Sequence, residues 1–138
     1  MIKAGIIGST GYAGQELVRL LMQHPDVEIV WYGSRSYIDQ QYADVFQNMF
    51  QIVDAKCMDD NMDALADAAD VIFTATPQGL CASLVNEDVL NKVKIIDLSA
   101  DFRIKDVEVY EKWYGIKHMN ASLPMSRKSS LYSCSLIN

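Results

Sequence analysis

The chain alternates between short apolar runs and segments whose apolar residues recur at helical spacing. Continuous apolar runs bounded by polar or glycine residues predict buried strands. Such runs occupy residues 2–7, 27–32, 71–76 and 93–98. Helical spacing, or a helix-starting Asp, predicts helices over residues 13–23, 62–69, 80–91 and 106–114. A short helix near residues 42–46 and a weak edge strand near residues 52–58 complete the predicted elements.

This order of elements predicts the fold class. Strands separated by helical segments pair in parallel through right-handed crossovers. The expected architecture is therefore an α/β, Rossmann-type doubly wound sheet, mostly parallel, with helices on both faces. Nothing in the chain repeats at a fixed period.

The last twenty residues differ in composition from the rest. Residues 1–118 contain all eighteen acidic residues and ten basic ones, whereas residues 119–138 carry only Arg127 and Lys128 as charges. Six of these twenty residues are serines, against five in the preceding 118. We expect a folded domain over residues 1–118 and a divergent tail over 119–138, in loop or disordered form, with a short strand near residues 131–137 as the alternative.

A glycine-punctuated turn joins the first predicted strand to the first helix. Glycines let the main chain approach an anion where a Cβ would clash, and a helix N-terminus favours negative charge. Strand, turn and helix in this order are typical of a dinucleotide pyrophosphate site. The alternative is an ordinary glycine-rich turn. The candidate residues are Gly8, Ser9, Thr10, Gly11, Tyr12, Ala13 and Gly14.

The residues at the end of the second predicted strand indicate which dinucleotide the chain would bind. A binder of NAD usually places Asp or Glu there to hold the ribose 2′-hydroxyl. This chain instead has Ser34, Arg35 and Ser36 after Gly33. A guanidinium can bind a 2′-phosphate through two hydrogen bonds, and the serine hydroxyls can add donors. The pattern favours NADP over NAD, with a solvated surface arginine as the alternative.

Composition and charge argue against several other classes of protein. The chain has a net charge of −6, which argues against a nucleic-acid surface. No apolar run approaches the roughly 20 residues of a membrane span, and the N-terminus begins directly with a strand rather than a signal peptide. Three widely spaced cysteines form neither a metal-ligand pair nor a disulfide framework, so we expect a cytoplasmic protein without a metal site.

The cysteines are weak candidates for a nucleophile. Cys81 lies near the start of a predicted helix, where a thiolate would be stabilised, but its apolar neighbours favour a buried core position. Cys57 has no supporting neighbours, and Cys134 lies in the divergent tail.

Two further loops follow predicted strands at the edge where a ligand would bind. The segment Thr76-Pro77-Gln78-Gly79 could offer main-chain groups to the cofactor, or it could be a plain strand-ending turn. The loop over residues 98–103 includes Ser99, Asp101 and Arg103. It could serve the ligand, or an Asp101–Arg103 ion pair could merely shape the loop.

Residues 1–118 resemble the N-terminal part of the N-acetyl-γ-glutamyl-phosphate reductase family. The resemblance rests on the glycine turn, Gly-Ser-Arg-Ser, Pro-Gln-Gly and, most specifically, Asp-Leu-Ser-Ala-Asp-Phe-Arg followed by Val-Tyr-Glu-Lys-Trp-Tyr-Gly. It implies NADPH-dependent reduction of an acyl phosphate to a semialdehyde in arginine biosynthesis. It further implies that the turn of residues 8–14 holds the pyrophosphate, residues 34–36 hold the 2′-phosphate, and Pro77 and Ser99 lie near the ribose or nicotinamide.

The chain also departs from that family. The Asn-Pro-Gly-Cys-Tyr-Pro-like segment that carries the family's nucleophile has no counterpart here, so no catalytic residue is assigned, and Cys134 does not take that role. The family's substrate domain is likewise missing, and we expect a cofactor-binding part left by truncation or a shifted reading frame. An aspartate-semialdehyde dehydrogenase-like protein and a non-catalytic NADP-binding module stay as alternatives. Homo-oligomer formation is left open.

Overall fold

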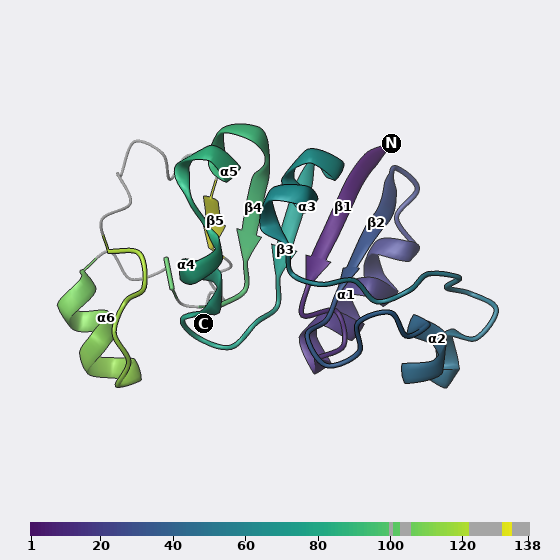
Figure 1. Ribbon diagram of the computed structural model, residues 1–138, viewed down its shortest axis with the longest axis horizontal. Coiled ribbons are helices and arrows are strands. Elements are labelled where there is room, and N and C mark those ends of the chain that lie inside the picture. The colour runs from purple at the N-terminus through teal and green to yellow at the C-terminus, as the bar shows by residue number, and fades with distance from the viewer. Residues whose placement is uncertain (100, 103–105, 122–130, 134–138) are drawn as a thin grey trace.

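The computed structural model describes residues 1–99, 101–102, 106–121 and 131–133, and its centre is a parallel sheet (Figure 1). The strands are β1 (Ile2–Ile7), β2 (Val27–Gly33), β3 (Val71–Thr74), β4 (Lys94–Asp97) and β5 (Leu131–Ser133). They lie in the order β2-β1-β3-β4-β5, and every pair is parallel. The expected doubly wound α/β class is confirmed.

Strand register places the carboxyl ends of four strands at one level. Ile7 of β1 pairs with Gly33 of β2 and with Thr74 of β3, and Thr74 pairs with Asp97 of β4. The segments that follow these strands therefore leave the sheet along one edge. In doubly wound folds this edge is where ligands bind.

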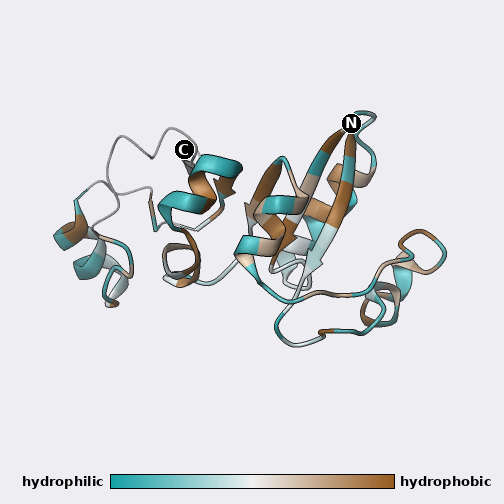
Figure 2. Ribbon diagram, turned by 45° about the horizontal axis from the view of Figure 1, so that its top comes forward, coloured by the Kyte–Doolittle hydropathy of each residue, from teal (hydrophilic) through white to brown (hydrophobic). Residues whose placement is uncertain are grey.

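Helices cover both faces of the sheet. They are α1 (Tyr12–Met22), α2 (Tyr42–Val45), η1 (Gln47–Met49), α3 (Met62–Ala68), α4 (Leu80–Leu84), α5 (Glu87–Lys92) and α6 (Val107–Tyr114). Figure 2 shows hydrophobic residues along the central strands and mixed hydrophilic and hydrophobic residues along the helices. None of the helices in these described ranges has the length and apolar character needed to cross a membrane.

Two hydrophobic clusters flank the sheet. Consecutive strand residues point to opposite faces, so Ile6 and Ile7 belong to different clusters. Ile6 packs with Val18 of α1 and with Tyr42 of α2. Ile7 packs with Leu65 of α3 and with residues of α4 and α5. The two clusters hold α1 and α3 against opposite faces of the sheet.

Two sequence-based expectations are wrong. The single helix expected over residues 80–91 is two helices, because Val85 is extended and the Asn86 side chain accepts a hydrogen bond from Val89 N at 2.9 Å. That bond caps a new helix. The weak strand expected over residues 52–58 consists only of isolated bridges, from Lys56 to Gln41 and from Met58 to Gly33.

Candidate functional site

A cavity of about 310 Å³ lies at the carboxyl edge of the sheet. Its walls come from the turn after β1, the segment after β2, the segment before α3 and the segment between β3 and α4. The lining residues are Ile7, Gly8, Thr10, Gly11, Ser34, Arg35, Ser36, Asp60, Ala75, Thr76, Pro77 and Leu80. The fold thus gathers most of the candidate residues around one space.

The glycine turn is shaped by two close approaches of backbone. Gly8 has φ of +79°, and a Cβ there would overlap the carbonyl oxygen of Ala75. A Cβ on Gly14 would overlap the backbone of Gly8. Gly11 differs, because its φ is −79° and a Cβ there would meet only Gly8 O, at 3.5 Å. The turn therefore requires glycine at positions 8 and 14 for its own packing, while the space beside Gly11 is open.

Hydrogen bonds tie this turn to the end of β2. Ser9 is buried, and both its backbone N–H and its hydroxyl donate to the carbonyl oxygen of Gly33, at 2.9 and 3.0 Å. The hydroxyls of Thr10 and Ser34 lie 2.9 Å apart. The buried Tyr42 hydroxyl donates to Ser9 O at 2.8 Å from the opposite side. The predicted pyrophosphate and 2′-phosphate segments therefore form one connected unit.

The N-terminus of α1 is left without a side-chain cap. Its capping residue is Gly11, which has no side chain to accept a hydrogen bond from the first turn. The first backbone N–H groups of a helix lack partners within the helix and can bind an anion. Tyr12 and Ala13 in this turn have exposed side chains and do not line the cavity. Only their backbone is available to the candidate site.

Arg35 extends along the cavity and is paired with an acid. Its side chain is 61% exposed, and its Nε–H donates to Asp60 Oδ2 at 2.5 Å. Asp60 was not among the candidates from sequence, since 25 residues separate it from Arg35 and only the tertiary fold joins them. Ser34 is buried next to Arg35, while Ser36 is exposed at the rim.

The far wall follows β3. Pro77 is exposed and lines the cavity, as does Thr76. The Thr76 hydroxyl oxygen is buried and has no hydrogen-bond partner within the described part of the chain. A buried hydroxyl without a partner is costly, which makes it a candidate to receive a ligand hydrogen bond. The sequence analysis included Thr76 in a candidate loop but did not single it out.

Ser99 lies outside the cavity lining. It is buried, and its hydroxyl donates to Asp97 Oδ2 at 2.8 Å, while its backbone N–H donates to Asp97 Oδ1. Thr74 donates to the same carboxylate at 2.9 Å. The placement near a ribose or nicotinamide, which the resemblance implies for Ser99, stays a prediction.

Asp101 connects α4 and α6. Its buried carboxylate accepts hydrogen bonds from Gly79 N at 2.7 Å, Ala82 N at 3.0 Å and the Tyr110 hydroxyl at 2.7 Å. Its backbone carbonyl faces His118 Nε2 at 2.5 Å. Asp101 therefore holds the start of α4, and with it the Pro77 wall, in place. The alternative partner, Arg103, lies outside the described residues.

Both described cysteines are buried. Cys81 has no exposed surface, and burial, followed by the negative charge of Asp97, raises the pKa of its thiol. Burial also raises the pKa of Cys57. A protonated, inaccessible thiol is not a nucleophile. Cys81 is thus the core residue that its neighbours favoured, and Cys134 lies outside the described residues.

No set of three or more His, Cys, Asp or Glu side chains in the described ranges is arranged to bind a metal ion. What the edge of the sheet offers is a cavity lined both by the glycine turn before the uncapped α1 and by the guanidinium of Arg35 with its flanking hydroxyls. Both the helix N-terminus and the guanidinium favour negatively charged groups of a ligand.

Comparison with known proteins identifies the domain type. Residues 3–124 match the family model described as the semialdehyde dehydrogenase NAD-binding domain. The chain is 74% identical over 118 residues to an N-acetyl-gamma-glutamyl-phosphate reductase of Lachnoclostridium phytofermentans and 75% identical over 118 residues to one of Lachnospira eligens. Each match covers 86% of this chain and 34% of the relative, so the chain spans about a third of these relatives' length.

A solved structure supports the fold independently. The crystal structure of aspartate semialdehyde dehydrogenase with NADP from Candida albicans matches with a TM-score of 0.64 at 18% identity, covering 98% of this chain and 42% of that one. The resemblance inferred from the motifs is confirmed by the curated relatives. The chain belongs to the semialdehyde dehydrogenase NAD-binding domain family.

Proposed function

We propose that this domain binds NADP(H) in the cavity at the carboxyl edge of the sheet. The observation that carries the proposal is the single cavity that joins the glycine turn to Arg35 and its flanking serines. The turn of residues 8–14 would hold the pyrophosphate on backbone N–H groups, because Gly8 and Gly14 bring main chain close and α1 is uncapped. Arg35, Ser34 and Ser36 would hold the 2′-phosphate.

The residues present fit this cofactor in two further respects. Thr76 contributes a buried hydroxyl oxygen without a partner in the described chain, and Pro77 lines the same wall. Both would lie toward the ribose or nicotinamide part of the ligand. When bound, NADPH supplies a hydride to a reducible carbon. The residues described here bind and orient the cofactor, and Asp101 positions the wall that Pro77 belongs to.

We further propose that the domain serves the reduction of N-acetyl-γ-glutamyl phosphate to the semialdehyde, as the names of its relatives indicate. This is a step of arginine biosynthesis, and we expect a cytoplasmic protein with a small acyl-phosphate substrate. The burial of both described cysteines favours a second candidate for the chain as it stands, a cofactor-binding unit without its own nucleophile. Reduction of the acyl phosphate by the purified chain would refute the second candidate, whereas an inactive chain agrees with both.

Calorimetric titration of the purified chain with NADPH and NADH tests the cofactor proposal. We expect NADPH to bind more tightly than NADH. Arg35→Ala should weaken NADPH binding by about 1.5–3 kcal/mol, the range for a hydrogen bond to a charged group, and should barely change NADH binding. Equal losses for the two cofactors would show that Arg35 does not contact the 2′-phosphate.

A further inference from the structure

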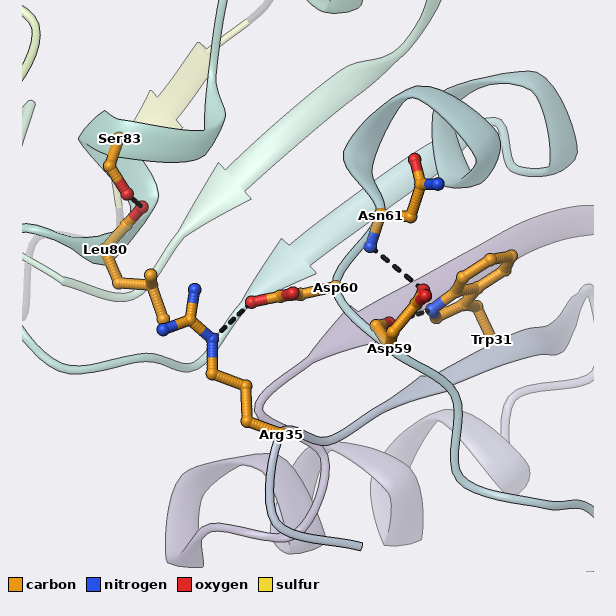
Figure 3. A network of polar contacts seen from close by, with 7 residues as sticks. All are labelled: Trp31, Arg35, Asp59, Asp60, Asn61, Leu80 and Ser83. Atoms are coloured by element: carbon orange, nitrogen blue, oxygen red, sulfur yellow. Dashed lines mark hydrogen bonds and ion pairs between the residues drawn. The ribbon is translucent and has the colours of Figure 1, made fainter. Parts of the chain in front are cut away.

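No acidic residue directly follows β2 in the sequence, but the fold brings the carboxylate of Asp60 to the end of that strand. Dinucleotide-binding folds that take NAD place a carboxylate at the end of the second strand to accept the ribose hydroxyl. Here that position is occupied by Arg35, but Asp60 reaches the same cavity from the segment before α3. Its carboxylate is 22% exposed and lies on the Nε edge of the guanidinium (Figure 3).

The segment that carries Asp60 is held on both sides. The indole N–H of Trp31 on β2 donates to the Asp59 carbonyl at 2.8 Å. The Asn61 side chain accepts from Ala64 N at 3.1 Å and so caps α3, and Asp59 Oδ1 accepts from Asn61 N. The backbone at Asp60 is therefore held in place by its two anchored neighbours.

The pairing occupies only part of Arg35. Guanidinium carries five N–H donors, and Asp60 accepts from the single one on Nε. The hydrogen bond to Asp60 uses Nε alone, and Figure 3 shows the two terminal nitrogens of Arg35 on the side of Leu80. Those nitrogens stay available to a phosphate, while the carboxylate adds a negative charge beside any phosphate they bind.

We infer that Asp60 sets the strength of the preference for NADPH over NADH. Its carboxylate opposes the 2′-phosphate through like charge and through competition for Arg35, and it offers an acceptor to the free 2′-hydroxyl of NADH. Arg35 then selects for the 2′-phosphate, and Asp60 limits that selectivity. This inference rests on the proposed NADP(H) site.

Asp60→Asn tests the inference, because it removes the charge and keeps the side-chain shape. The ratio of the NADH to the NADPH dissociation constant should rise about two- to fivefold, the change expected for a partly exposed charge pair. NADPH should bind more tightly and NADH no better than before. Asp67→Asn is the matched control, since Asp67 pairs with Lys92 at 2.7 Å away from the cavity lining. Its ratio should equal that of the wild type.

The outcomes separate the two proposals. If the unsubstituted chain binds neither cofactor, the proposed function is wrong and the inference is wrong with it. If the chain prefers NADPH and Arg35→Ala removes that preference, but Asp60→Asn leaves the ratio unchanged or lowers it, only the role of Asp60 is overturned. Asp60→Ser is a second variant that removes the charge, and it should raise the ratio in the same direction.

Discussion

Gly11 and Gly14 belong to one turn, yet alanine at Gly14 should reduce stability, whereas alanine at Gly11 should reduce NADPH binding. At Gly14 an added Cβ would overlap the carbonyl group of Gly8 and the Cα of Ser9. These are backbone atoms, and Ser9 is fixed by two hydrogen bonds to Gly33 and one from Tyr42. The turn cannot yield without breaking them, so Gly14→Ala should lower the free energy of unfolding by about 1–3 kcal/mol, as overpacking does.

Gly11→Ala should spare the fold. Its Cβ meets only Gly8 O, at the ordinary contact distance of 3.5 Å, and its backbone is already extended at φ −79° and ψ 172°. Alanine restricts the unfolded chain but caps a helix less well than glycine, so the two effects offset each other to within about 0.5 kcal/mol. The new methyl group would occupy the cavity wall where the pyrophosphate approaches, and NADPH should bind at least about tenfold more weakly.

Urea unfolding without ligand and calorimetric titration with NADPH measure the two effects separately. We expect a lower unfolding midpoint only for Gly14→Ala, and weak NADPH binding by a folded protein only for Gly11→Ala. The reasoning is refuted if Gly11→Ala binds NADPH as tightly as the unsubstituted chain. It is also refuted if Gly14→Ala unfolds at the same urea concentration as the unsubstituted chain.

Three further predictions concern buried polar groups. Tyr42→Phe should cost about 1–3 kcal/mol of unfolding free energy in urea, because the carbonyl of Ser9 loses its buried donor, and no cost would show that water replaces it. The Asp101 carboxylate accepts three hydrogen bonds, and Asn keeps only one side-chain oxygen to accept them. Asp101→Asn should therefore lower the unfolding free energy by about 2 kcal/mol or more, and it should speed proteolysis near α6. Burial raises the pKa of Cys81 and of Tyr110, so their contribution to stability is complete below the unfolded-state values near 8.5 and 10 and is lost as the pH rises above them. The melting temperature should therefore fall above about pH 9, and Tyr110→Phe should reduce the fall at the upper end of this range.

The N-terminal βαβ unit and its glycine turn could be predicted from sequence because their signals are local. An apolar run, three glycines and a helical repeat follow one another within the first 23 residues. Other features depend on competition between local signals. The helical spacing through residues 80–91 predicted one helix, but the capping bond of Asn86 ends that pattern and starts another.

The site was harder to predict where it depends on tertiary contacts. Arg35 was predicted from its position after a strand, whereas Asp60 has no local signal and reaches Arg35 only because the segment before α3 runs beside β2. Sequence also could not distinguish the roles of the turn glycines. The positive φ lies at Gly8, where a Cβ would also overlap the carbonyl of Ala75, and neither feature has a local signal in the sequence.

The way α6 is attached has a consequence for how unfolding of this domain is observed. In Figure 1 this helix stands apart from the sheet; Tyr110 is its one buried residue, and the Tyr110 hydroxyl connects the helix to Asp101. Elements with little buried apolar surface open locally at a lower free energy than the core. The chain has two tryptophans, Trp31 on β2 and Trp113 on α6, and Trp113 is 78% exposed. Tryptophan fluorescence therefore reports chiefly the sheet edge through Trp31, while detachment of α6 passes almost unseen by emission and is followed instead by amide hydrogen exchange.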